Sequence, residues 1–88
     1  MEKDKLIALI DERFRAVNGG LEFKILRDGV REDGDWWYVP VVATHHGKDV
    51  THGDPEFPRE KTVGIFADVE EDMEENHHLT VLLVPAVA

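Results

Sequence analysis

One segment carries apolar side chains at both alternating positions, and it constrains the fold more than any other feature: residues 35–44, Asp-Trp-Trp-Tyr-Val-Pro-Val-Val-Ala-Thr. Side chains alternate between the two faces of a strand, so Trp36 and Trp37 must lie on opposite sides of a sheet. One of them faces the core, and the other marks either a covered second face or a partner surface. Pro40 has no backbone N–H, so an edge strand or a bulge is predicted there.

The first helix is predicted at residues 5–17, where apolar side chains recur every three or four positions. Asp4 is the predicted N-cap, because its carboxylate can accept a free N–H of the first turn. The run Asn-Gly-Gly at 18–20 predicts the end of the helix, since both residue types adopt the left-handed conformation readily. The apolar positions of this helix are Leu6, Ile10, Phe14 and Val17.

A second helix is predicted at about residues 60–76, again from helical spacing. Gly64 weakens this prediction, because glycine disfavours a helix interior. The alternative is a short strand at 61–66, with the helix beginning near Ala67. The apolar positions on which the helix prediction depends are Val63, Phe66, Val69 and Met73.

Two further strands complete the predicted elements. Residues 21–27 alternate and end at two Asp-Gly turn signals, so an extended hairpin tip is expected before the strand at 35–44. Residues 79–84 are almost entirely apolar and precede Pro85, the pattern of a strand buried on both faces or central in a sheet. Residues 45–58 contain two glycines and two prolines, which predicts a long irregular loop.

These elements follow the order α-β-β-α-β in a single domain that spans residues 1–88. The two first strands form an antiparallel hairpin, and the second helix returns the chain to a third, parallel strand. The sequence therefore predicts an α+β fold: a two-layer sandwich with a three-stranded mixed sheet and both helices packed on one face. The opposite sheet face would then be open and would carry Trp36 or Trp37.

Composition removes several classes of function. The chain contains no cysteine and no serine, which excludes disulfides, thiolate chemistry and serine nucleophiles. Its glycines do not have the spacing of a phosphate-binding loop, so we expect no cofactor and no enzymatic activity. The N-terminus lacks the pattern of a signal peptide, and the longest apolar run, 81–88, is too short to span a bilayer. A cytoplasmic protein is the expectation.

The charge is strongly acidic and unevenly distributed. The formal net charge is −9, which disfavours nucleic-acid and anionic membrane partners and favours a basic protein partner. The acids concentrate at residues 68–75, toward the C-terminal end of the second predicted helix, where the helix dipole disfavours them. This run fits either a solvated helix face or a surface for a basic partner. Mimicry of a nucleic acid is a further alternative, which the Lys and Arg residues spread through the first 61 positions make less favourable.

A metal site is the principal alternative to protein binding. His45, His46 and His52 lie with Asp49 and Asp54 in the predicted loop, and imidazole and carboxylate suit Zn²⁺, Ni²⁺ or Fe²⁺. Their spacing matches no established metal-binding motif.

We therefore expect a small, non-catalytic protein-interaction domain, such as an adaptor, an inhibitor or a chaperone-like protein. It would bind a partner or itself through the tryptophan-bearing strand or through the acidic helix. The predicted partner-binding residues are Trp36, Trp37, Tyr38, Glu71, Asp72 and Glu75.

Overall fold

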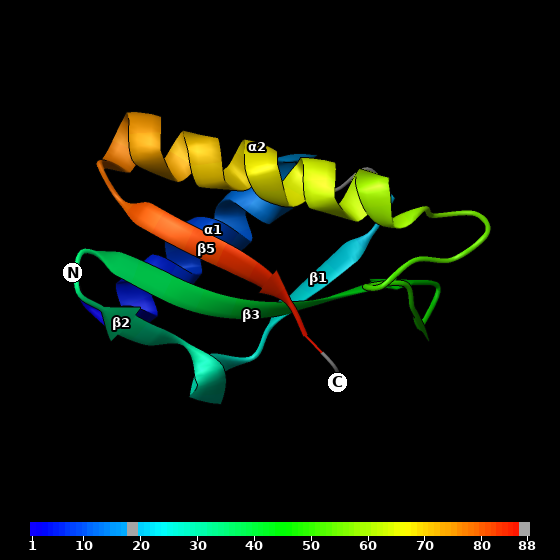
Figure 1. Ribbon diagram of the computed structural model, residues 1–88, viewed down its shortest axis with the longest axis horizontal. Coiled ribbons are helices and arrows are strands. Elements are labelled where there is room, and N and C mark those ends of the chain that lie inside the picture. The colour runs from blue at the N-terminus through cyan, green and yellow to red at the C-terminus, as the bar shows by residue number, and fades with distance from the viewer. Residues whose placement is uncertain (18–19, 87–88) are drawn as a thin grey trace.

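The computed structural model describes residues 1–17 and 20–86, and the sequence order of its elements is shown in Figure 1. The described residues form two α-helices, one 3₁₀ turn and a single sheet of five strands. Part of the helix end predicted at 18–20 lies outside the described residues. The elements are α1 (Lys3–Val17), β1 (Glu22–Ile25), the 3₁₀ turn η1 (Arg27–Gly29), β2 (Arg31–Asp33), β3 (Trp36–His45), β4 (Lys48–Asp49), α2 (Arg59–His77) and β5 (Thr80–Pro85).

Within the described residues, all other strands pair with the ten-residue strand β3. Thr44 pairs with both β1 and β4, so these two strands lie on opposite edges of β3. Trp36 pairs with both β2 and β5, so β2 and β5 also lie on opposite edges. Val41 pairs with both β1 and β5, which places β1 and β2 on one edge and β4 and β5 on the other. The β5 pairing is parallel and the others are antiparallel. The predicted mixed sheet is confirmed, but it has five strands and not three. The strands form three rows: β1 with β2, then β3, then β4 with β5.

Pro40 explains why one row of the sheet is broken between β1 and β2. Leu26 donates its N–H to the Pro40 carbonyl at 2.9 Å, but Pro40 has no N–H to return. The chain leaves the ladder at this point, turns through η1 and resumes pairing at Arg31. β3 is therefore a central strand and not an edge strand, and the irregularity predicted at Pro40 falls on its neighbour.

The close approach of η1 to Pro40 leads to a stability prediction. A Cβ atom at Gly29 would lie 2.7 Å from Cγ of Pro40, so we expect Gly29→Ala to lower the free energy of unfolding by about 1–3 kcal/mol. The Pro40→Ala background removes the clashing ring, and the same substitution should cost less there. Gly64→Ala is the matched control, because nothing lies within 4 Å of its Cβ position in α2, and it should stabilise by roughly 0.5–1 kcal/mol. Denaturant unfolding of the four variants measures both effects. Equal costs for Gly29→Ala with and without Pro40 would contradict this packing.

Both helices cover the same face of the sheet, which confirms the two-layer α+β sandwich. Trp37, Val39 and Val41 point from β3 into this core, and Figure 1 shows α1 behind the sheet with α2 alongside β5. No helix of the described residues covers the other face of β3. The helical residues of the core are Leu6, Ile7, Ile10 and Phe14 from α1 and Phe66, Val69 and Met73 from α2.

The turns differ from the sequence prediction. The tip between β2 and β3 is a two-residue turn at 34–35 and is not extended, and Gly34 has the positive φ (63°) that suits the first position of a type II′ turn. The polar residues before it form η1 and β2. The segment 45–58 is not wholly irregular, because it begins with a second tight hairpin into β4. His46 and Gly47 form that turn, with φ values of 51° and 80°.

The helices begin and face slightly differently from the prediction. Asp4 is not the N-cap, because α1 begins at Lys3, and its carboxylate pairs with Arg27. Residues 61–66 are helical, so the strand alternative is wrong. Val63 is exposed and Thr62 is buried in its place, so one of the four predicted apolar positions is wrong, whereas Phe66, Val69 and Met73 are confirmed. The buried row of α2 is therefore Thr62, Phe66, Val69 and Met73.

Candidate functional site

A groove between α2 and β5 brings together the tryptophan-bearing strand and the acidic helix, which were predicted as alternative binding surfaces. It has a volume of about 470 Å³. Trp36 lines it from β3, beside Thr80 and Leu82 of β5, so its floor is largely apolar. Three acids on the facing side of α2 line its rim. These acids are Glu70, Glu71 and Glu74.

The floor of the groove belongs to the open face of the sheet. Leu82 lies opposite Tyr38, and Thr80 lies opposite Trp36, in the parallel pairing of β3 and β5. Leu82 is 47% exposed, which is unusual for a leucine in the middle of a strand. The prediction that this strand is buried on both faces or central is therefore wrong, because β5 lies at the edge of the described sheet. Its alternation of buried and exposed positions was hidden by a run of apolar residues.

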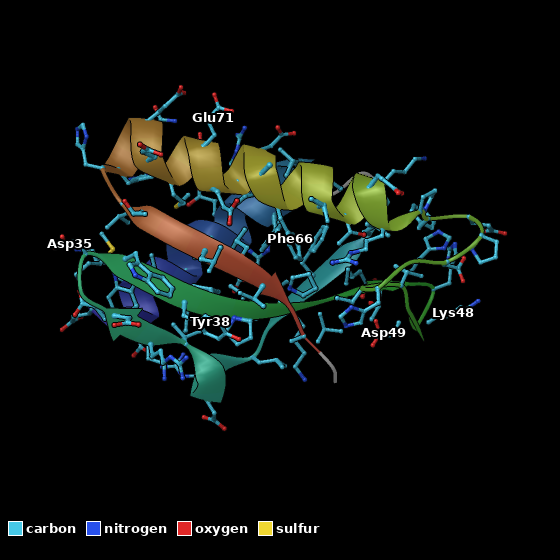
Figure 2. The ribbon with its side chains drawn as sticks, viewed as in Figure 1. Asp35, Tyr38, Lys48, Asp49, Phe66 and Glu71 are labelled. Atoms are coloured by element: carbon cyan, nitrogen blue, oxygen red, sulfur yellow. The ribbon has the colours of Figure 1, made fainter. Side chains whose placement is uncertain are left out.

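The three acids on the rim differ in whether their carboxylates already have a partner in the protein. Glu70 accepts the backbone N–H of Leu83 at 2.8 Å, so its carboxylate is already bound to the edge of β5. Among the described residues, no cationic nitrogen lies within 4.0 Å of the carboxylate of Glu71 or Glu74. These two carboxylates are thus available to a ligand. Figure 2 shows Glu71 on the α2 helix and Tyr38 on the open side of β3.

The other predicted partner-binding residues are distributed around the molecule. Trp37 is 8% exposed and belongs to the core, as alternation requires for one tryptophan of the pair. The ring of Tyr38 is covered by the guanidinium of Arg31, which lies 4.6 Å from the ring centroid. Asp72 faces α1, where it lies 3.7 Å from Nε of Arg13, and it accepts a hydrogen bond from Asn76. Only Trp36 and Glu71 of the predicted set line the groove.

Sequence reasoning missed Thr80, Leu82, Glu70 and Glu74 as members of this surface. The signal for the two acids was present, because positions 70, 71 and 74 lie on one side of an α-helix. What the sequence lacked was the position of β5 beside α2, which brings these acids to the edge of the sheet.

The segment 45–58, which carries His45, His46 and His52, is stabilised by contacts among its own side chains. The ring of His45 lies 4.0 Å from that of His46 and 4.3 Å from that of Phe57, measured between centroids. Lys48 pairs with Asp54 at 2.5 Å. Across residues 1–17 and 20–86, no three His, Asp or Glu side chains converge in a way that could hold a metal ion. The described geometry therefore gives the metal alternative at His45, His46 and His52 no ligand set.

Thr51 anchors this segment to the sheet. Its buried hydroxyl accepts the Ala43 N–H at 2.8 Å and donates to the carboxylate of Asp49 at 2.6 Å. The Thr51 N–H also donates to Asp49 at 2.9 Å. These two hydrogen bonds hold the pKa of Asp49 below its ordinary value. The pKa of Asp54 is lowered separately, first by its hydrogen bond with Lys48.

This network predicts a selective change in titration. Thr51→Val removes the hydroxyl but keeps the backbone N–H, so the pKa of Asp49 should rise toward the ordinary value while that of Asp54 stays in place. In the wild type, a depressed folded-state pKa stabilises the fold above the pKa of unfolded Asp49. That contribution is lost as the pH falls through the folded-state pKa. NMR titration of the two carboxyl groups measures both values, and an unchanged pKa at Asp49 would contradict the assigned cause.

Comparisons with protein families, curated proteins and solved structures found no match for this chain. No helix in the described residues has the length and apolar character needed to cross a membrane.

Proposed function

We propose that the protein is a small, non-catalytic interaction domain that binds a basic protein partner in the groove between α2 and β5. The observation that carries this proposal is the position of Trp36 in the same groove as Glu71 and Glu74. An apolar floor with an acidic rim suits an aliphatic or aromatic side chain flanked by Lys or Arg.

The energetics of such a surface divide between its two parts. Trp36 is half-buried and presents the large amphipathic surface that commonly dominates binding energy at interfaces. Leu82 extends this apolar area on the neighbouring strand. The carboxylates contribute less affinity, because exposed ion pairs are screened, but they select the sign of the partner's charge.

The charge of the whole chain supports the same choice of partner. A formal net charge of −9 attracts basic proteins at long range and accelerates their association at low salt. Two of the groove acids have no cationic partner within the described structure, so a basic ligand would not have to displace existing ion pairs.

A pair of charge reversals on one helix tests this proposal. Isothermal titration with a synthetic peptide of alternating lysine and valine should give weak, salt-sensitive binding to the wild type. Trp36→Ala should weaken binding by about tenfold or more, because it removes the apolar anchor. Glu71→Lys should weaken it by roughly three- to tenfold.

Glu75→Lys is the matched control for Glu71→Lys, because it makes the same charge change on an exposed residue outside the groove. It should weaken binding by about twofold or less, through long-range charge alone. Equal losses for the two reversals would show that the peptide responds only to net charge. Undiminished binding by Trp36→Ala would place the ligand elsewhere. Either result would overturn the proposal.

A further inference from the structure

A second groove, between α1 and β1, exposes the backbone edge of the sheet. It has a volume of about 450 Å³ and is lined by all residues from Leu21 to Ile25. Successive residues of a strand point to opposite faces, so a groove lined by all of them follows the edge. Leu26 donates its N–H toward β3. Backbone N–H and C=O groups alternate in direction along a strand, and Phe23 and Ile25 lie an odd number of residues from Leu26. Their backbone groups therefore point away from β3.

The opposite edge of the sheet is protected in ways that β1 is not. The backbone N–H of Ala86 donates to Val41 of β3, so the backbone groups of Leu83 and Pro85 point away from β3. Glu70 occupies the N–H of Leu83, and Pro85 has no N–H, which leaves β5 poorly suited to pair with another strand. Within the described residues, the outward N–H groups of β1 have neither protection. β2 continues the same row with charged, exposed side chains only.

The side chains of β1 are complementary to a second copy of the same strand. Glu22 and Lys24 are exposed, flank Phe23 and share the open face of the sheet. No ion-pair partner lies within 4.0 Å of either side chain among the described residues. If two antiparallel β1 strands pair with Phe23 opposite Phe23, each Glu22 faces the Lys24 of the other copy. Opposite charges in directly facing positions favour such a pairing.

The flanking helix repeats this pattern. Asp11 and Arg15 lie one helical turn apart on α1, and both line the groove. A two-fold axis presents the same pair in reverse order, so acid again meets base. The four charged residues of the groove sum to zero, two acids against two bases, on a chain whose formal net charge is −9. The net charge of the chain is therefore not concentrated at this edge, and the local charges do not oppose the approach of a second copy.

Phe23 adds an apolar contact at the centre. Its ring stacks on Phe14 with centroids 4.3 Å apart, and it remains half-buried. A second Phe23 across the axis would cover the remaining exposed surface of the ring.

From these observations we infer that two copies of the chain associate through antiparallel pairing of their β1 edges, forming one continuous sheet across a two-fold axis. The partner at this edge is a second copy of the chain. This dimer does not depend on the basic partner proposed for the other edge, and it leaves both Trp36 grooves accessible.

Charge-reversal variants test the dimer. Sedimentation equilibrium up to about 0.5 mM should detect dimerisation of the wild type, since pairing of short strands gives a small interface. Lys24→Glu and Glu22→Lys should each raise the dimer dissociation constant by roughly tenfold or more, because facing charges become alike. An equimolar mixture of the two variants should restore association, as a heterodimer. The double variant with both substitutions should restore the homodimer.

Two controls separate this edge from other causes. Lys5→Glu makes the same charge change as Lys24→Glu on an exposed residue outside the groove, and it should leave the dissociation constant within about twofold of the wild type. Trp36→Ala should also leave it unchanged. A strictly monomeric wild type would overturn the inference. So would failure of the mixture to associate, or a dimer that Trp36→Ala disrupts and Lys24→Glu does not.

Discussion

The backbone hydrogen bonds of β3 are the contacts on which the rest of the structure depends. In the described part of the chain, all other strands pair with β3, and none pairs with another. Pro40 removes one donor from the middle of this strand, and the neighbouring row adapts by turning away through η1. Gly29 permits that turn, because no larger side chain fits against the proline ring. A single missing N–H thus shapes one side of the sheet.

A central strand that pairs on both of its edges, with helices on one face, leaves three surfaces for function: the open face and the two edges of the sheet. Trp36 and Leu82 give the open face its apolar surface, and α2 brings two free carboxylates beside it. Glu70 and Pro85 protect the β5 edge from strand pairing, so that side of the molecule is suited to side-chain recognition. Within residues 1–17 and 20–86, the outward backbone groups of the β1 edge have no strand beside them and the local charges balance, which suits pairing with an identical strand.

Periodicity predicted the α+β sandwich, because the apolar spacing of α1, α2 and β3 is long and clear. It also predicted that one of the two adjacent tryptophans would enter the core. It placed Phe66, Val69 and Met73 of α2 in the core correctly but not the first position of that row, since Thr62 is buried and the more apolar Val63 is exposed. The burial of β5 was also predicted wrongly, because Leu82 is apolar but exposed. Pairing within the loop was missed because β4 is only two residues long.

Amide hydrogen exchange can measure whether β3 is hydrogen-bonded along both of its edges. The N–H groups of Val39 and Val41 point to β5, whereas those of Tyr38 and Val42 point to β2 and β1. Both sets should exchange at least roughly 1,000-fold more slowly than unprotected amides, because they open only when the domain unfolds. Rapid exchange of either set, with slow exchange of the other, would show that β3 is an edge strand and would contradict the account.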